Sequence, residues 1–80
     1  MKAIKMTNAK LQKEINCLAK CEMITGELFI EIAVKANSYK ELEEKQETIL
    51  NGLITPKGLK LNDNLLYRKD LKIYISFKKA

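Results

Sequence analysis

The stretch ELFIEIAVKANSYKELEE, residues 27–44, carries the clearest structural signal in this sequence. Apolar residues alternate with mostly polar ones over residues 27–36, which predicts a strand with one buried face. The face predicted to be buried carries Leu28, Ile30, Ile32, Val34 and Ala36. The opposite face carries Glu27, Phe29, Glu31, Ala33 and Lys35. Residues 38–41 then match a helix capping box, so a helix is predicted to follow the strand directly.

The predicted capping box places two reciprocal hydrogen bonds at the start of this helix. Ser38 would accept one from the amide of Glu41, and the Glu41 carboxylate would accept one from the amide of Ser38. The stripe predicted to face the core consists of Leu42, Gln46, Ile49, Leu50 and Leu53. Asn51 and Gly52 are predicted to end the helix, with Gly52 in the left-handed conformation.

Before this stretch, the sequence predicts one more strand and one more helix. Residues 2–6 are a short strand candidate, and Thr7 or Asn8 can cap a helix that runs to about Lys20. The core stripe of that helix has helical spacing and consists of Leu11, Ile15 and Leu18. Residues 21–25 are predicted as a weak strand that a tight turn at Thr25-Gly26 joins to the next strand.

The C-terminal part ends in a second well-marked strand. Residues 71–78 alternate between a predicted inner face of Leu71, Ile73, Ile75 and Phe77 and an outer face of Lys72, Tyr74, Ser76 and Lys78. Thr55-Pro56-Lys57-Gly58 predicts a type I turn, with proline second and glycine fourth. Residues 59–70 are ambiguous, with residues 65–67 as a short strand candidate and Lys69-Asp70 as a turn.

The predicted order is strand, helix, strand, strand, helix, an optional strand and a final strand. This order is the split βαβ, or ferredoxin-like, pattern. We therefore predict an α+β fold with an antiparallel sheet of four or five strands and two helices on one face. Residues 53–70 exceed the minimal pattern and could add an edge hairpin. A chain of 80 residues is expected to form a single domain, residues 1–80.

One segment also resembles a known family. ELFIEIAVKANSYKELEEKQETILNGL, residues 27–53, combines a strand ending in Ala-Asn-Ser with a helix carrying Glu-Leu-Glu and a Leu-x-x-Leu segment that contains a glycine. It resembles the small ferredoxin-like accessory domain near the N-terminus of conjugative-transfer (type IV secretion) ATPases. The resemblance implies a fold and an origin on a mobile element. The chain has no GxxxxGK[ST] loop, so ATP hydrolysis is not carried over.

Composition gives little support to catalysis. The chain has no histidine, the commonest general acid and base, and only three glycines. Cys17 and Cys21 are two thiols, whereas a structural zinc site needs four ligands. The carboxylates Glu43, Glu44 and Glu47 are predicted to face solvent. We therefore expect a protein that is not an enzyme and has no cofactor and no metal.

The N-terminus and the hydropathy pattern bear on location. MKAIKMTNAKLQKEIN contains lysines but no apolar segment followed by a cleavage site, so it does not match a signal peptide. No apolar run approaches the roughly 20 residues of a membrane-spanning helix. We therefore expect a cytoplasmic protein without a membrane partner.

Charge and aromatic residues point to binding instead. The net charge is +5, and residues 52–80 hold seven cations and two anions. Such a basic surface attracts nucleic acid or an acidic protein surface. Candidate partner-binding residues are Phe29, Tyr67, Tyr74, Lys57, Lys60, Arg68, Lys69 and Lys72. Two carboxylates, Glu27 and Glu31, flank Phe29 on its face, which disfavours an RNA-binding platform there because they repel phosphate.

These observations lead to one functional hypothesis and one alternative. The preferred hypothesis is a small non-enzymatic binding protein of phage or mobile-element origin that occupies the surface of a protein partner. Inhibition of a multi-subunit host defence or regulatory complex is one role of this kind. The alternative is a nucleic-acid-binding module that uses the basic C-terminal third. An open sheet edge also allows a homodimer through edge-strand pairing.

Overall fold

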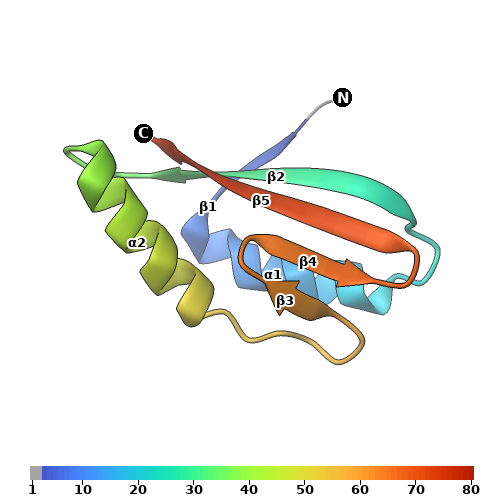
Figure 1. Ribbon diagram of the computed structural model, residues 1–80. Coiled ribbons are helices and arrows are strands. Elements are labelled where there is room, and N and C mark those ends of the chain that lie inside the picture. The colour runs from blue at the N-terminus through green and yellow to red at the C-terminus, as the bar shows by residue number, and fades with distance from the viewer. Residues whose placement is uncertain (1–2) are drawn as a thin grey trace.

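The computed structural model describes residues 3–80, and this part of the chain forms five strands and two helices (Figure 1). The elements are β1 (Ile4–Thr7), α1 (Asn8–Lys20), β2 (Gly26–Val34), α2 (Tyr39–Asn51), β3 (Lys60–Asn62), β4 (Leu65–Arg68) and β5 (Leu71–Lys79). The predicted α+β class is confirmed. Lys2, the first residue of the predicted strand 2–6, lies outside the described residues.

The strands form one mixed sheet in the order β1-β2-β5-β4-β3. β1 runs parallel to β2 and β2 runs parallel to β5, whereas β5, β4 and β3 are antiparallel neighbours. The predicted antiparallel pairing therefore holds only for the last three strands. The fold is still roughly that of the predicted split βαβ pattern, because it begins with a β-α-β unit and both helices cover one face of the sheet (Figure 1).

The predicted hairpin at Thr25-Gly26 is wrong. Residues 21–25 form a loop, and Gly26 is the first residue of β2, where its φ of 95° marks the entry into the strand. The Gly26 N–H donates to the Asp70 carbonyl oxygen at 2.8 Å. The positive φ of this glycine thus directs β2 alongside β5 instead of turning the chain back into a two-residue hairpin.

The hydrophobic core lies between the inner face of the sheet and the helices. Its buried side chains are Leu11, Ile15, Leu18, Ile30, Ile32, Val34, Leu42, Leu59, Leu66, Leu71, Ile73 and Ile75. The predicted faces of the two long strands are confirmed, because Ile30 and Ile75 are 0 % exposed and the outward Phe29 is 36 % exposed. A register shifted by one residue would have reversed these values.

The start of α2 follows the predicted capping box in one of its two bonds. Ser38 Oγ accepts a hydrogen bond from the Glu41 amide at 3.2 Å. The Glu41 carboxylate, however, accepts from the Asn37 amide at 3.1 Å, and it also pairs with Lys45 at 3.1 Å. The hydrogen bond from Asn37 and then the one from Lys45 hold the pKa of Glu41 below its ordinary value.

The end of α2 differs from the prediction. Gly52 has φ −84° and ψ −5°, which is right-handed, and its N–H donates to the Thr48 carbonyl oxygen at 3.0 Å. The helical hydrogen bonding therefore continues into Gly52, so the left-handed conformation predicted there is wrong. Within the predicted stripe only Leu42 is buried, and Ile49 and Leu50 are half-buried.

Replacing Ser38 with alanine is expected to lower the free energy of unfolding by about 1 kcal/mol, because the Glu41 amide loses its hydrogen-bond acceptor. The measurement is the urea midpoint of each protein at constant slope. Ser76→Ala is a suitable control, because it removes a hydroxyl whose hydrogen bond to the Ile30 carbonyl is longer, at 3.4 Å. Equal midpoints for Ser38→Ala and the wild type would show that Ser38 does not cap α2.

The C-terminal third forms two consecutive hairpins. The turn before β3 has a hydrogen bond from the Leu59 N–H to the Pro56 carbonyl oxygen at 3.2 Å, and Gly58 has φ 97°. This turn begins one residue later than predicted and uses glycine at the position where a left-handed residue is required. The predicted strand at residues 65–67 and the turn at Lys69-Asp70 are confirmed, and β3 with β4 forms the edge hairpin.

Candidate binding surface

The sheet surface that faces away from the helices brings together all three aromatic candidates, Phe29, Tyr67 and Tyr74. Strand register places Leu65 beside Tyr74 and Tyr74 beside Phe29, across β4, β5 and β2. The neighbouring row consists of Lys60, Tyr67, Lys72 and Glu27. We call the surface of Phe29, Leu65, Tyr67 and Tyr74, with its bordering lysines Lys60 and Lys72, the aromatic face.

The centre of the aromatic face is a stacked pair of rings. The centroids of Phe29 and Tyr74 lie 5.2 Å apart with an angle of 15° between the ring planes. The Tyr74 hydroxyl donates to the Glu27 carboxylate at 3.0 Å. This hydrogen bond raises the pKa of Tyr74, because the phenolate would lose the bond and lie beside a carboxylate. The stacking and this hydrogen bond thus favour one orientation of the Tyr74 ring against Phe29.

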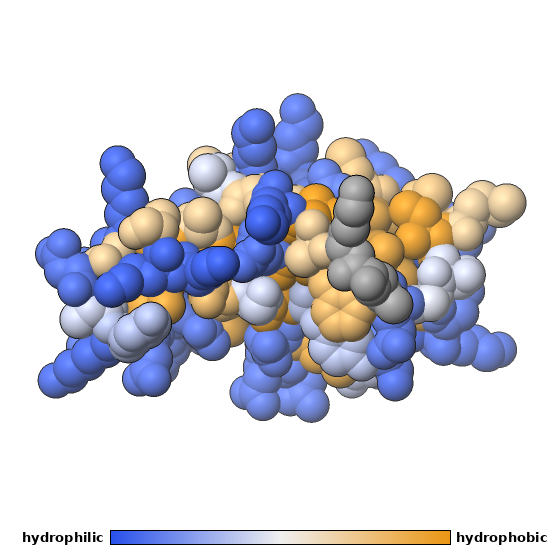
Figure 2. All heavy atoms as spheres, turned by 90° about the horizontal axis from the view of Figure 1, so that it is seen from above, coloured by the Kyte–Doolittle hydropathy of each residue, from blue (hydrophilic) through white to orange (hydrophobic). Residues whose placement is uncertain are grey.

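The two carboxylates next to Phe29 both find partners on β5. Glu27 accepts the bond from Tyr74 and lies opposite Lys72 in the strand register. Glu31 pairs with Lys78 across 3.8 Å. Figure 2, seen from above the view of Figure 1, shows apolar side chains along the middle of the molecule, with hydrophilic ones projecting around them. On the outer face of the sheet, the strand register places the apolar row of Phe29, Tyr74 and Leu65 next to charged side chains such as Glu27 and Lys72. An apolar centre with a polar border is the usual anatomy of a protein interface.

The basic candidates are distributed over more than one side of the molecule. Lys60, Lys69 and Lys72 line a shallow groove of about 430 Å³ together with Tyr67. Lys57 lies elsewhere, in a depression that it shares with Lys20 and Asn16 of α1. Lys57 therefore does not belong to the same basic surface as Lys60, Lys69 and Lys72, although all four lie within residues 52–80.

Arg68 has a structural role that the sequence did not reveal. Its Nη2 donates to the carbonyl oxygens of Cys21 at 2.9 Å and Ile24 at 2.8 Å, and its Nε pairs with Asp70 at 3.3 Å. The side chain is 15 % exposed. The only arginine of the chain therefore holds the loop of residues 21–25 against the β4–β5 hairpin, and most of its donors are in use.

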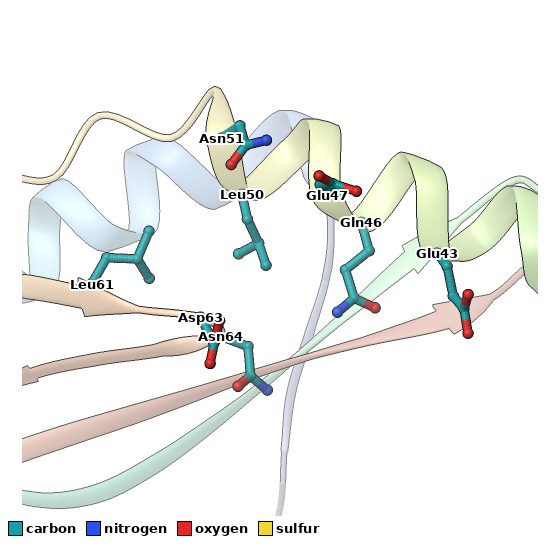
Figure 3. A pocket seen from close by; sticks show the side chains of 8 residues that line it. All are labelled: Glu43, Gln46, Glu47, Leu50, Asn51, Leu61, Asp63 and Asn64. Carbon is teal, nitrogen blue, oxygen red and sulfur yellow. The ribbon is translucent and has the colours of Figure 1, made fainter.

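A second concave feature was missed by the sequence analysis. A groove of about 580 Å³ lies between α2 and the β3–β4 hairpin (Figure 3). We call it the acidic groove; its lining residues are Glu43, Gln46, Glu47, Leu50 and Asn51 from α2, and Leu61, Asp63 and Asn64 from the hairpin. The one sequence signal for this groove is the spacing of Glu43 and Glu47, which places both carboxylates on one side of α2. The residues that the β3–β4 hairpin adds to the lining depend on how the hairpin packs against the helix, which the sequence does not indicate.

The remaining reactive groups do not assemble into a recognisable centre. Within the described part of the chain, no three His, Cys, Asp or Glu side chains lie close enough together to hold a metal ion. Cys17 is exposed, Cys21 is half-buried, and both are free thiols. Among residues 3–80, no helix is long and apolar enough to cross a membrane.

Comparisons with known proteins give no further guidance. The chain matches no protein-family model, no curated protein and no solved structure.

Proposed function

We propose that this chain is a small non-enzymatic binding protein that occupies the surface of a protein partner with its aromatic face. The observation that carries the proposal is the stack of Phe29 and Tyr74, which is partly exposed on the outer side of the sheet. Tyrosine and other aromatic side chains are enriched at the energetic centres of protein interfaces. Here Tyr67 and Leu65 extend the apolar area along the neighbouring strand.

The surroundings of this stack favour a protein over a nucleic acid. Because Phe29 and Tyr74 stack on each other, one face of each ring is covered, and fewer ring faces remain on which nucleic-acid bases could stack. Glu27 and Glu31 lie next to the rings, where they disfavour a phosphate backbone. The bordering lysines would increase the association rate with an acidic partner surface.

The sheet edges are weaker candidates for the same interaction. β1 and β3, the two edge strands, contain four and three residues. A partner strand, including one from a second copy of the chain, would therefore gain few backbone hydrogen bonds there. We accordingly assign the main contact to the aromatic face and treat a homodimer through an edge as secondary.

The proposal extends to biological context. Small size, a lysine-rich composition and the resemblance of residues 27–53 to an accessory domain of conjugative-transfer ATPases support a phage or mobile-element origin. We propose that the protein acts in the cytoplasm and that its partner belongs to a host defence or regulatory complex, which it inhibits by covering a surface. No catalytic step is needed for this action.

The test is quantitative affinity capture from the native host with wild-type and variant proteins. Phe29→Ala/Tyr74→Ala is expected to recover the partner at least about tenfold less than the wild type, because two interface anchors are lost. Tyr39→Ala is the matched control, since Tyr39 is an exposed aromatic residue on α2, away from the aromatic face. Circular dichroism of each variant checks that the fold is kept.

Two outcomes would contradict the proposal. One is equal recovery of every captured protein by the double variant and the wild type. The other is tight, sequence-dependent binding of nucleic acid.

Nucleic-acid binding is the second candidate function, and the cluster of Lys60, Lys69 and Lys72 around Tyr67 favours it. Titration with random DNA and RNA near physiological salt should show no binding, or non-specific binding with a dissociation constant of roughly 10⁻⁴–10⁻⁶ M. Tight, sequence-dependent binding would replace the proposed function with the second candidate.

A further inference from the structure

The acidic groove exposes apolar surface that the chain itself does not cover. Leu42, near the start of α2, is buried in the core, whereas Leu50, two turns later, is only half-buried. Leu61 on β3 is half-buried as well. In Figure 3 the Leu50 and Leu61 side chains point from the helix and the hairpin into the space between them. The groove therefore has an apolar floor that is accessible to a ligand.

The charge of the groove is uniform. The ionisable side chains that line it are Glu43, Glu47 and Asp63, and none of them has an ion-pair partner among residues 3–80. On the same helix, Glu41 is paired with Lys45 across 3.1 Å. A molecule with a net charge of +5 thus leaves three carboxylates unneutralised around one apolar concavity. This arrangement repels phosphate and attracts cations.

We propose that the acidic groove binds a short amphipathic segment of a protein partner that carries lysine or arginine beside leucine-sized side chains. The apolar side chains would pack on Leu50 and Leu61, and the cations would face Glu43, Glu47 and Asp63. From Glu43 to Asn51 α2 advances about 12 Å, which matches roughly two turns of a helical ligand. An amphipathic helix in a hydrophobic groove is a common recognition mode.

This surface is separate from the aromatic face. The groove lies between α2 and the β3–β4 hairpin, whereas the aromatic face is the side of the sheet that the helices leave open. The inference therefore goes beyond the proposed function and does not depend on it. A partner, or two partners, can contact both surfaces at once.

The test uses nuclear magnetic resonance of the isotope-labelled protein with a short synthetic helical peptide built only of leucine and lysine. Amide signals of residues 46–51 and 61–64 are expected to shift on titration, and the same peptide with glutamate in place of lysine is expected to cause no shifts there. Shifts that map to the aromatic face, or to no defined surface, would overturn the proposal.

Two charge variants with equal net charge separate the groove from general electrostatics. Glu43→Lys/Glu47→Lys is expected to weaken peptide binding at least about tenfold. Glu22→Lys/Glu44→Lys changes two exposed carboxylates outside the groove lining and is expected to leave the affinity within about twofold of the wild type. An equal loss in both double variants would mean that net charge alone attracts the peptide, and the proposal would fail.

Two further variants test the apolar part of the groove and its separation from the aromatic face. Leu50→Gln removes one of the two apolar side chains of the groove floor and leaves Leu61 in place, and it is expected to weaken binding at least about fivefold. Phe29→Ala/Tyr74→Ala should leave the peptide affinity unchanged. Normal binding by Leu50→Gln would overturn the groove proposal, whereas loss of host-protein capture by Phe29→Ala/Tyr74→Ala concerns only the aromatic face.

Discussion

Replacing Ile32 with alanine is expected to lower the free energy of unfolding by about 2–4 kcal/mol. Ile32 is 0 % exposed and lies on β2 between Met6 of β1 and Phe77 of β5 in the strand register. The substitution removes three carbon atoms at the centre of the layer between the sheet and the helices. The surrounding residues are held by strand pairing on both sides, so the cavity can close only partly.

The size of this loss is large for so short a chain. Small domains have a free energy of unfolding near the lower end of about 5–15 kcal/mol, because they bury a smaller fraction of their surface. Urea denaturation of both proteins measures the effect. The control is Ile4→Ala, the same chemical change at a side chain that is 39 % exposed on the edge strand, with an expected loss below about 1 kcal/mol. Comparable losses at both positions would contradict the burial pattern of the sheet.

Replacing Arg68 with methionine is expected to lower the free energy of unfolding by about 2 kcal/mol. Methionine keeps the apolar stem of the side chain but removes both hydrogen bonds to the carbonyl oxygens of Cys21 and Ile24. The Ile24 carbonyl then regains a partner only if the loop of residues 21–25 moves to admit water, whereas the Cys21 carbonyl keeps the longer hydrogen bond from the Ile24 N–H at 3.4 Å. Thermal unfolding measures the stability, and amide hydrogen exchange of the loop should become faster in the variant.

Two further variants test the assignment of this effect to the carbonyl bonds. Asp70→Ala removes the exposed partner of Arg68, and its expected cost is no more than about 1 kcal/mol because exposed ion pairs contribute little. Arg68→Lys keeps the charge but cannot donate two hydrogen bonds in the fixed geometry of a guanidinium group, so an intermediate loss is expected. If Arg68→Met were no less stable than Asp70→Ala, the bonds to the loop would not matter.

Local features of the fold could be predicted well from the sequence. The alternation in residues 27–36 and 71–78 predicts which side chains face the core, because burial of one face of a strand leaves a period of two in the sequence. The boundary at Ser38 could be predicted because a cap uses neighbouring residues only. Both signals are confined to a few consecutive positions.

Strand partners could not be predicted in the same way. β2 pairs in parallel with β5, which is distant in the sequence, and neither strand encodes the direction of its neighbour. The hairpin predicted at Thr25-Gly26 was wrong because a glycine with positive φ can either form a turn or begin a strand, and the local sequence does not distinguish the two. Gly52 likewise ends α2 without the left-handed conformation for which glycine is favoured.

The two surfaces differ in how far the sequence revealed them. Phe29 and Tyr74 could be placed on one face because strand alternation is a local signal, and the structure shows in addition that they stack. Lys57 and Arg68 could not be separated from the other cations, because counting charges along a segment does not show on which face of the molecule each side chain lies. The acidic groove depends on how α2 lies against the β3–β4 hairpin, which no single segment specifies.

The central position of β5 has a consequence for biosynthesis. β5 follows every other element in the chain but lies in the middle of the sheet, between β2 and β4. During translation, at about 5–20 residues per second, β2 therefore waits on the order of seconds before its longest neighbour has been made. The nascent chain can form the β1-α1-β2 unit in that time, but one edge of β2 stays open. Such an edge is a site for aggregation or chaperone binding, so the yield of native protein should depend on how quickly residues 71–79 leave the ribosome.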